Sequence, residues 1–214
     1  MSNLQYQEYY RRHLPHFQPR GFGFFITFRL ANSLPREVVE KLLDEAKQLD
    51  ESFLKTQALP EEYNLKTIEQ QKLFEQWDIA LHTSMSRNRY LEDERVASIV
   101  VDSIRFHDKE WFDLEAFCIM PNHVHLVLTP MEKAEGTDYS LAEITHNIKR
   151  NSSKQANQIL GRTGAFWQHE NYDHVIRDSI ELERIVQYVL YNPVKASLIE
   201  NRQDWKWSYS KCEI

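Results

Sequence analysis

Two histidines separated by one residue are the feature of this sequence that most clearly implies chemistry. His123 and His125 lie in the run Met120–Leu128, where aliphatic residues alternate with them. Because successive side chains of a β-strand point to opposite faces, this run predicts two imidazoles side by side on one face of a strand. Paired neutral imidazoles can bind a divalent cation such as Mn²⁺, and Mg²⁺ fits with added water and carbonyl ligands. Alternatively, both histidines are solvent-facing strand residues with no special role.

A tyrosine one helical turn before an asparagine is the second such feature. Tyr188 and Asn192 are four residues apart near the end of a segment with helical spacing, so they lie on one helix face. The phenol falls beside Glu181 and Arg184 on the polar flank, where it could face a site. The carbonyl oxygen of Asn192 could be a third ligand for the same cation. Alternatively, the tyrosine is a packing residue and the asparagine caps the helix end.

The hydrophobic periodicity predicts the elements that must position these groups. Alternating or continuous apolar runs predict strands at 22–30, 111–120, 123–129 and 172–176. Helical spacing predicts helices at about 34–49, 92–106, 141–160 and 180–191. This order predicts an α+β fold in which an antiparallel sheet is sandwiched by helices.

We expect one main domain with additions. A length of 214 residues is sufficient for a substantial hydrophobic core. We expect a basic and aromatic arm at 1–20, the domain at 21–208, and a tail at 209–214. The charged, glutamine-rich segment at about 51–90 is expected to be a helical insertion after the first helix.

The composition limits the class of protein. No window approaches the roughly 20 apolar residues of a membrane span, and the polar start has no signal-peptide core, so we expect a cytoplasmic location without membrane association. Cys118 and Cys212 are too few for a disulfide scaffold or a cysteine zinc site. The formal charge of −6 means that any binding to phosphates needs a local basic surface.

Basic residues gather in two places. The polar face of the predicted helix 141–160 carries Lys149, Arg150 and Lys154, the best basic patch in the chain. Arg11 and Arg12 lie in the N-terminal arm, which could contact nucleic acid or could equally be a surface tail.

Several strings of this sequence occur together in one known family. Met120-Pro121-Asn122-His123-Val124-His125 is followed by Trp167-Gln168, by Asp173-His174-Val175-Ile176-Arg177-Asp178, and by Tyr188-x₃-Asn192-Pro193-Val194-Lys195-Ala196. In combination, over roughly 21–208, they resemble the REP-associated tyrosine transposases, relatives of the single-tyrosine insertion-sequence transposases of the HUH superfamily.

The resemblance implies a ferredoxin-like core and a metal-dependent enzyme. It implies that His123 and His125 hold a divalent cation, Mg²⁺ or Mn²⁺, that Asn192 takes the place of a third ligand, and that Tyr188 is the nucleophile. The implied reaction is nicking and strand transfer on single-stranded DNA near hairpins such as REP-like palindromes. Attack by the phenol would give a 5′-phosphotyrosine and a free 3′-OH, and another 3′-OH could reverse the step without ATP.

The implied substrate suggests which residues contact it. We expect phosphate contacts from basic side chains and stacking of unpaired bases on Trp167, although the type of this residue suits the core equally well. The basic residues expected to take part are Lys149, Arg150, Lys154, Arg184, Arg11 and Arg12.

Two other functions remain open at this point. One is a domesticated relative that binds hairpin DNA or RNA as a regulator without cutting it. The other is a metal-dependent phosphohydrolase, which needs more carboxylates beside the two histidines than the sequence places there. The sequence also leaves open whether the protein acts as a monomer or a homodimer; we expect it to associate with the nucleoid.

Overall fold

The computed structural model describes residues 5–11, 15–55, 60–84 and 88–212, apart from the side chains of 10–15 and 49–71. A five-stranded antiparallel sheet forms its centre, with the strand order β6-β3-β5-β4-β7. The strands are β3 (Gly23–Leu30), β4 (Phe112–Ile119), β5 (His123–Pro130), β6 (Trp167–Ile176) and β7 (Ser208–Ser210). Two short strands, β1 (Tyr9–Arg11) and β2 (Pro15–Phe17), pair separately.

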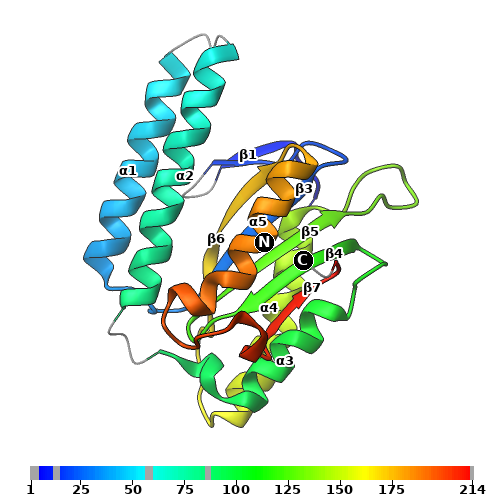
Figure 1. The fold of residues 1–214 in the computed structure, drawn as a ribbon. Helices are drawn as coiled ribbons and strands as arrows, with labels where there is room; N and C mark the ends of the chain where they lie inside the picture. Colours follow the sequence, from blue (N-terminus) through cyan, green and yellow to red (C-terminus); the bar gives the residue numbers. More distant parts are fainter. Residues whose placement is uncertain (1–4, 12–14, 56–59, 85–87, 213–214) are drawn as a thin grey trace.

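Helices cover both faces of this sheet (Figure 1). They are α1 (Arg36–Lys55), α2 (Pro60–Thr83), α3 (Glu94–Arg105), α4 (Leu141–Ile159) and α5 (Ser179–Lys195), with single 3₁₀ turns η1 (Tyr90–Glu92) and η2 (Arg202–Asp204). The predicted α+β sandwich is confirmed. None of the helices in the described part of the chain is long and apolar enough to cross a bilayer.

The two faces of the sheet have separate cores, and this separation positions the histidines. Val124, Leu126 and Leu128 of β5 pack into the larger core with α3 and α4. Val127 points the other way and packs with Val186 and the rest of the apolar stripe of α5. Because side chains alternate along a strand, the odd-numbered residues of β5 all face the α5 side.

Local capping signals fix where the helices begin. The side chain of Asp178 accepts a hydrogen bond from the backbone N–H of Glu181 and so starts α5 at Ser179. Ser140 and Glu143 form a reciprocal capping box at the start of α4. The start of α5 sets the rotation of the helix, and with it the face on which Tyr188 emerges.

The expected helical insertion at about 51–90 contains a helix, and the structure shows how that helix packs. It forms the second half of a helical hairpin: α2 runs antiparallel beside α1, and the pair extends past the sheet (Figure 1). Leu42, Ala46 and Leu73 form the small core between the two helices. The C-terminal end of α2 reaches back over the α5 side of the sheet, where it enters the site described below.

The ends of the chain also contribute to the fold. β1 and β2 come from the expected arm, and His16 of β2 bonds to Glu170 and Asp173 of β6. β7 pairs with β4 and carries the sheet two residues beyond the expected domain end at 208.

Candidate metal centre and nucleophile

The two histidines lie at the start of β5, directly after the turn that joins it to β4. His123 and His125 are both fully buried, so the alternative that they face solvent is wrong. They pair in register with Arg29 and Thr27 of the neighbouring strand β3. Their Nε2 atoms are 3.1 Å apart. The sequence prediction of two imidazoles side by side is therefore confirmed in geometry.

The helical hairpin adds two residues to this pair. Asp78 of α2 is fully buried, and its Oδ1 lies 3.3 Å from Nε2 of His125 and 3.7 Å from Nε2 of His123. His82, one turn later on α2, places its Nε2 3.6 Å from the same oxygen. One ligand atom from each of these four residues lies within 4.8 Å of the others. We call this group the Asp78 cluster.

Hydrogen bonds on the far side of each strand imidazole orient it toward the cluster. Nδ1 of His123 donates to Oδ1 of Asn122 at 2.7 Å, because a carbonyl oxygen can only accept. Nδ1 of His125 is 2.9 Å from the hydroxyl of Thr27. The amide of Asn122 also donates to the backbone oxygen of Leu81 at 2.9 Å and so joins the turn to α2. Outer hydrogen bonds of this kind fix the tautomer of metal-binding histidines.

The cluster fits a divalent transition metal by both chemistry and spacing. Two ligands about 2.1 Å from one tetrahedral ion lie about 3.4 Å apart, and the four separations given above range from 3.1 to 3.7 Å. Three imidazoles and one carboxylate are a donor set that suits such ions. Oδ1 of Asp78 is buried without a hydrogen-bond partner, which a cation would supply. The described residues can therefore hold a metal ion.

The charge states in this cluster favour metal binding. Burial lowers the pKa of His123 well below its usual range, and the neighbouring His125 lowers it further, so this imidazole stays neutral. Burial also lowers the pKa of His82. Burial alone would raise the pKa of Asp78, but the close approach of His125 and of the other nearby imidazoles holds it well below the usual value. A carboxylate and neutral imidazoles are the ligand forms.

Tyr188 reaches the same cluster from α5. Its hydroxyl donates a hydrogen bond to Oδ2 of Asp78, and its ring centroid is 5.8 Å from that of His125. Burial raises the pKa of this phenol, and the adjacent carboxylate raises it further. The phenol therefore remains protonated beside the ionised carboxylate. The side chain of Asp78 links the phenol oxygen to the two strand histidines.

Asn192 meets the cluster through a different contact from the one expected. It is fully buried, and its Oδ1 lies 2.7 Å from Nε2 of His82. Among the described residues, its amide nitrogen has no hydrogen-bond partner. The helical spacing thus brings Tyr188 and Asn192 to the same place, with His82 between the amide and the rest of the cluster.

Two basic side chains of α5 flank the phenol. Lys195, which the sequence analysis did not single out, places its Nζ 3.7 Å from Oδ2 of Asp78 and 5.0 Å from the centre of the Tyr188 ring. Arg184 is exposed and lines a cavity of about 110 Å³, which Tyr188 and Tyr172 also line. This cavity leads from the surface of α5 to the phenol.

The residues expected to contact DNA differ in accessibility. Arg150 and Lys154 are exposed on α4, and Arg150 lines a groove of about 400 Å³ between α4 and the start of β6. The ammonium of Lys149 is directed into β6, where it donates to the backbone oxygens of Gln168 and His169. Arg12 and the side chain of Arg11 lie outside the described part of the chain.

The expectation for Trp167 requires correction. Its side chain is only 6% exposed, its ring packs edge-on against Phe28 and Phe166, and its indole N–H donates to the hydroxyl of Ser152. Because the side chain is buried and its indole N–H is already bonded, this tryptophan is a core residue and not a platform for unpaired bases.

Sequence reasoning missed Asp78, His82 and Lys195. One signal was available: Asp78 and His82 are four residues apart, the spacing that places two side chains on one helix face. It was overlooked because the predicted helical insertion was not expected to reach the site.

Comparison with known proteins identifies the class. Residues 79–192, which are 114 of the 214 residues, match the family model described as "Transposase IS200 like". The chain therefore belongs to the IS200-like transposase family. The matched segment runs from the residue after Asp78 through Asn192, so it includes both strand histidines and Tyr188.

Two relatives make the resemblance more specific. A Haemophilus influenzae protein described as a REP-associated tyrosine transposase is 30% identical over 102 residues, 45% of this chain and 58% of that protein. The REP-associated tyrosine transposase of Escherichia coli is 27% identical over 97 residues, 45% of this chain and 53% of that protein. The chain thus spans a little over half the length of each relative.

A solved structure supports the fold. It is that of a REP-associated tyrosine transposase bound to a REP hairpin, and it matches 93% of this chain and 80% of its own with a TM-score of 0.53 and 18% identity.

Proposed function

We propose that this protein nicks and joins single-stranded DNA near hairpins, such as REP-like palindromes, in a reaction that depends on a divalent cation. Tyr188 is the proposed nucleophile. His123 and His125, together with Asp78 and His82, are the proposed ligands, and Asn192 supports the cluster or joins it. The two relatives and the hairpin-bound structural neighbour support the choice of substrate.

One observation carries the proposal: the phenol of Tyr188 and two buried imidazoles from a different element meet at a single carboxylate. Oδ2 of Asp78 accepts from the phenol, and Oδ1 faces the imidazoles. A phosphate placed beside the cluster is then within reach of the phenol oxygen. A tyrosine that only packs in the core would not require this arrangement of groups.

The chain itself supplies the nucleophile and its orientation. A bound cation would polarise the scissile phosphate and offset its negative charge. The Tyr188 oxygen forms a bond to phosphorus and loses its proton to solvent, while the P–O3′ bond breaks and the leaving 3′ oxygen takes up a proton from solvent to give the 3′-OH. Phe25 and Phe74 pack against the phenol ring edge-on, which fixes its direction.

A covalent adduct assay tests the proposal. The protein is incubated with a labelled oligonucleotide that carries a hairpin with single-stranded flanks, with Mg²⁺ or Mn²⁺ or with EDTA. We expect a metal-dependent protein–DNA adduct that survives denaturing electrophoresis. Tyr188→Phe should abolish it, whereas Tyr191→Phe, an exposed tyrosine on the same helix, should not. An adduct that persists in Tyr188→Phe would refute the assignment.

The structure also gives some support to a second function, a metal-dependent phosphohydrolase. The objection to it was a lack of carboxylates beside the histidines, and Asp78 is such a carboxylate. The same assay separates the functions. A hydrolase would release product without any adduct and would stay active as Tyr188→Phe, whereas a non-cleaving regulator would bind the oligonucleotide and leave it intact.

A further inference from the structure

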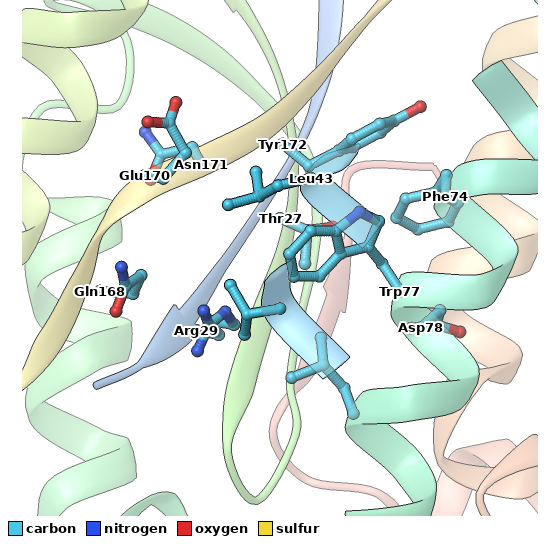
Figure 2. A pocket seen from close by; sticks show the side chains of 12 residues that line it. Thr27, Arg29, Leu43, Phe74, Trp77, Asp78, Gln168, Glu170, Asn171 and Tyr172 are labelled. Carbon is cyan, nitrogen blue, oxygen red and sulfur yellow. The ribbon is translucent and has the colours of Figure 1, made fainter. Parts of the chain in front are cut away.

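A cavity of about 120 Å³ lies between the helical hairpin and the strands β3 and β6 (Figure 2). Two of its lining residues also belong to the surroundings of the candidate metal centre: Asp78 is part of the cluster, and Thr27 bonds to His125. The cavity is therefore directly adjacent to the place where the phenol and the imidazoles meet. It is large enough for several water molecules or a small polar group.

A buried arginine in this cavity has no carboxylate partner. Arg29 of β3 is only 8% exposed, and its guanidinium makes one hydrogen bond, to the hydroxyl of Ser33 at 3.3 Å. No ion pair links it to any acidic residue in the described part of the chain. Burial lowers the pKa of Arg29 to about 10, with no opposing effect from a nearby negative charge. A buried cation without a counterion is costly unless a ligand supplies one.

A second donor in the same cavity also lacks an acceptor. The indole of Trp77 lines the cavity, and its centre is 5.8 Å from the Arg29 guanidinium. Within the part of the chain that the structure describes, its buried N–H has no hydrogen-bond partner. Arg29 and Trp77 come from different elements, so no single local conformation explains both unsatisfied donors. In Figure 2 their side chains line the same space between α2 and the two strands.

The two acidic residues that line the cavity are engaged elsewhere. Glu170 bonds to His16 of β2 at 2.8 Å. Asp78 faces the three imidazoles and the phenol of Tyr188. The cavity thus presents a guanidinium and an indole N–H to a ligand, and these donors match an oxyanion and not a cation.

We propose that this cavity binds a backbone phosphate of the DNA strand next to the scissile phosphate, with Arg29 as its main contact. The inference rests on the proposed function and extends it with a phosphodiester subsite. The cavity and the cluster share Asp78, and Thr27 of the cavity bonds to His125 of the cluster, so a strand whose scissile phosphate lies at the cluster would have a neighbouring phosphate at the guanidinium. Tyr172 and Phe74 form aromatic walls of the cavity, beside which the intervening nucleotide can lie.

Binding measurements test this subsite without requiring cleavage. The protein carries Tyr188→Phe, and the probe is the labelled hairpin oligonucleotide with single-stranded flanks, followed by fluorescence anisotropy over a range of salt concentrations. We expect Arg29→Gln to weaken binding about 10- to 100-fold. The slope of log K against log salt should fall by about 0.7, the value for one lost contact to a single strand. Arg36→Gln, in an exposed pair with Glu40, is the control and should change neither.

Neutral methylphosphonate linkages, introduced one at a time, locate the contact. With Arg29 present, one linkage beside the cleavage position should weaken binding about tenfold, and with Arg29→Gln the same linkage should cost less than twofold. Equal losses of binding at every linkage, or equal losses with and without Arg29, would overturn the subsite. In that case, a covalent adduct formed by the unmodified protein would still support the proposed function. Absence of both binding and adduct would overturn both. If Arg29→Gln melted several degrees lower than the Tyr188→Phe parent without DNA, a structural role would replace the proposed one.

Discussion

Removal of the carboxylate from the Asp78 cluster should weaken metal binding sharply. Asp78→Asn keeps the shape of the side chain and replaces one charged oxygen with an amide nitrogen. Oδ1 of Asp78 lies 3.3–3.7 Å from three imidazole nitrogens and has no hydrogen bond of its own. Loss of an outer-sphere partner typically costs 10- to 100-fold in metal affinity. A direct ligand should cost at least about 100-fold, which corresponds to about 2.8 kcal/mol.

The melting temperature reports this loss. If Mn²⁺ is present at 100 times the dissociation constant of the unmodified protein, it stabilises the fold by about 2.7 kcal/mol. A site 100-fold weaker would gain only about 0.4 kcal/mol at the same concentration. For a protein of this size, 1 kcal/mol corresponds to about 2–4 °C. The metal-induced rise should therefore fall from about 5–11 °C to about 1 °C, measured by differential scanning fluorimetry with and without Mn²⁺.

A charge change nearby provides the control. Glu75→Gln makes the same chemical change on the same helix, at an exposed position one turn before Asp78, and should retain the full metal-induced rise. If Asp78→Asn also retained it, Asp78 would not be a ligand. The ion would then be held by the three histidines at most, and the four-residue site would be refuted.

Two further predictions concern the fold around the site. Burial alone would lower the pKa of His16, but its hydrogen bonds with Asp173 and Glu170 raise it to about 9. Its contribution to stability is therefore at most about 3.4 kcal/mol; it is fully present below about pH 6.5 and is lost as the pH rises through about 9. Urea unfolding at pH 6 and pH 10 should show the unmodified protein more stable than His16→Gln only at the lower pH; an equal difference at both would contradict the shift. Trp167→Ala should cost about 3–5 kcal/mol in unfolding free energy because it empties a buried site, whereas a loss of DNA affinity at unchanged stability would restore the stacking role.

The sequence predicted the parts of the fold that have a strong local pattern. β5 was predicted because aliphatic side chains alternate along it on the core side. Its neighbour β4 is an apolar run, interrupted by Asp113 and Glu115, that ends at the Pro121-Asn122 turn. α5 was predicted because the capping residue Asp178 comes directly before a segment whose apolar residues have helical spacing. These same elements carry His123, His125 and Tyr188, so the strand and helix parts of the site could be predicted from one chain.

The missed elements lack such a pattern. The apolar residues of α2 are spread around the helix and not gathered on one face, because α2 contacts α1 on one side and the sheet on another. The first half of β6 lies at the edge of the sheet and reads Trp-Gln-His-Glu-Asn, in which polar residues obscure the alternation. β7 has only three residues. Asp78 and His82 were missed because their position depends on how α2 packs, which no local period specifies.

Three buried polar atoms without partners lie around one place in the structure. They are Oδ1 of Asp78, the indole N–H of Trp77 and the amide nitrogen of Asn192, and the unpaired guanidinium of Arg29 lies beside them. Folded proteins satisfy nearly all buried polar groups, so such exceptions call for an explanation. The negative group, the carboxylate of Asp78, faces the imidazoles, and the positive group, the guanidinium of Arg29, faces the adjoining cavity. That separation of charge is the arrangement required by the two proposed ligands of opposite sign, a cation at the cluster and a phosphate beside it, and under this proposal a chain with a net charge of −6 would bind a nucleic acid through a local basic group.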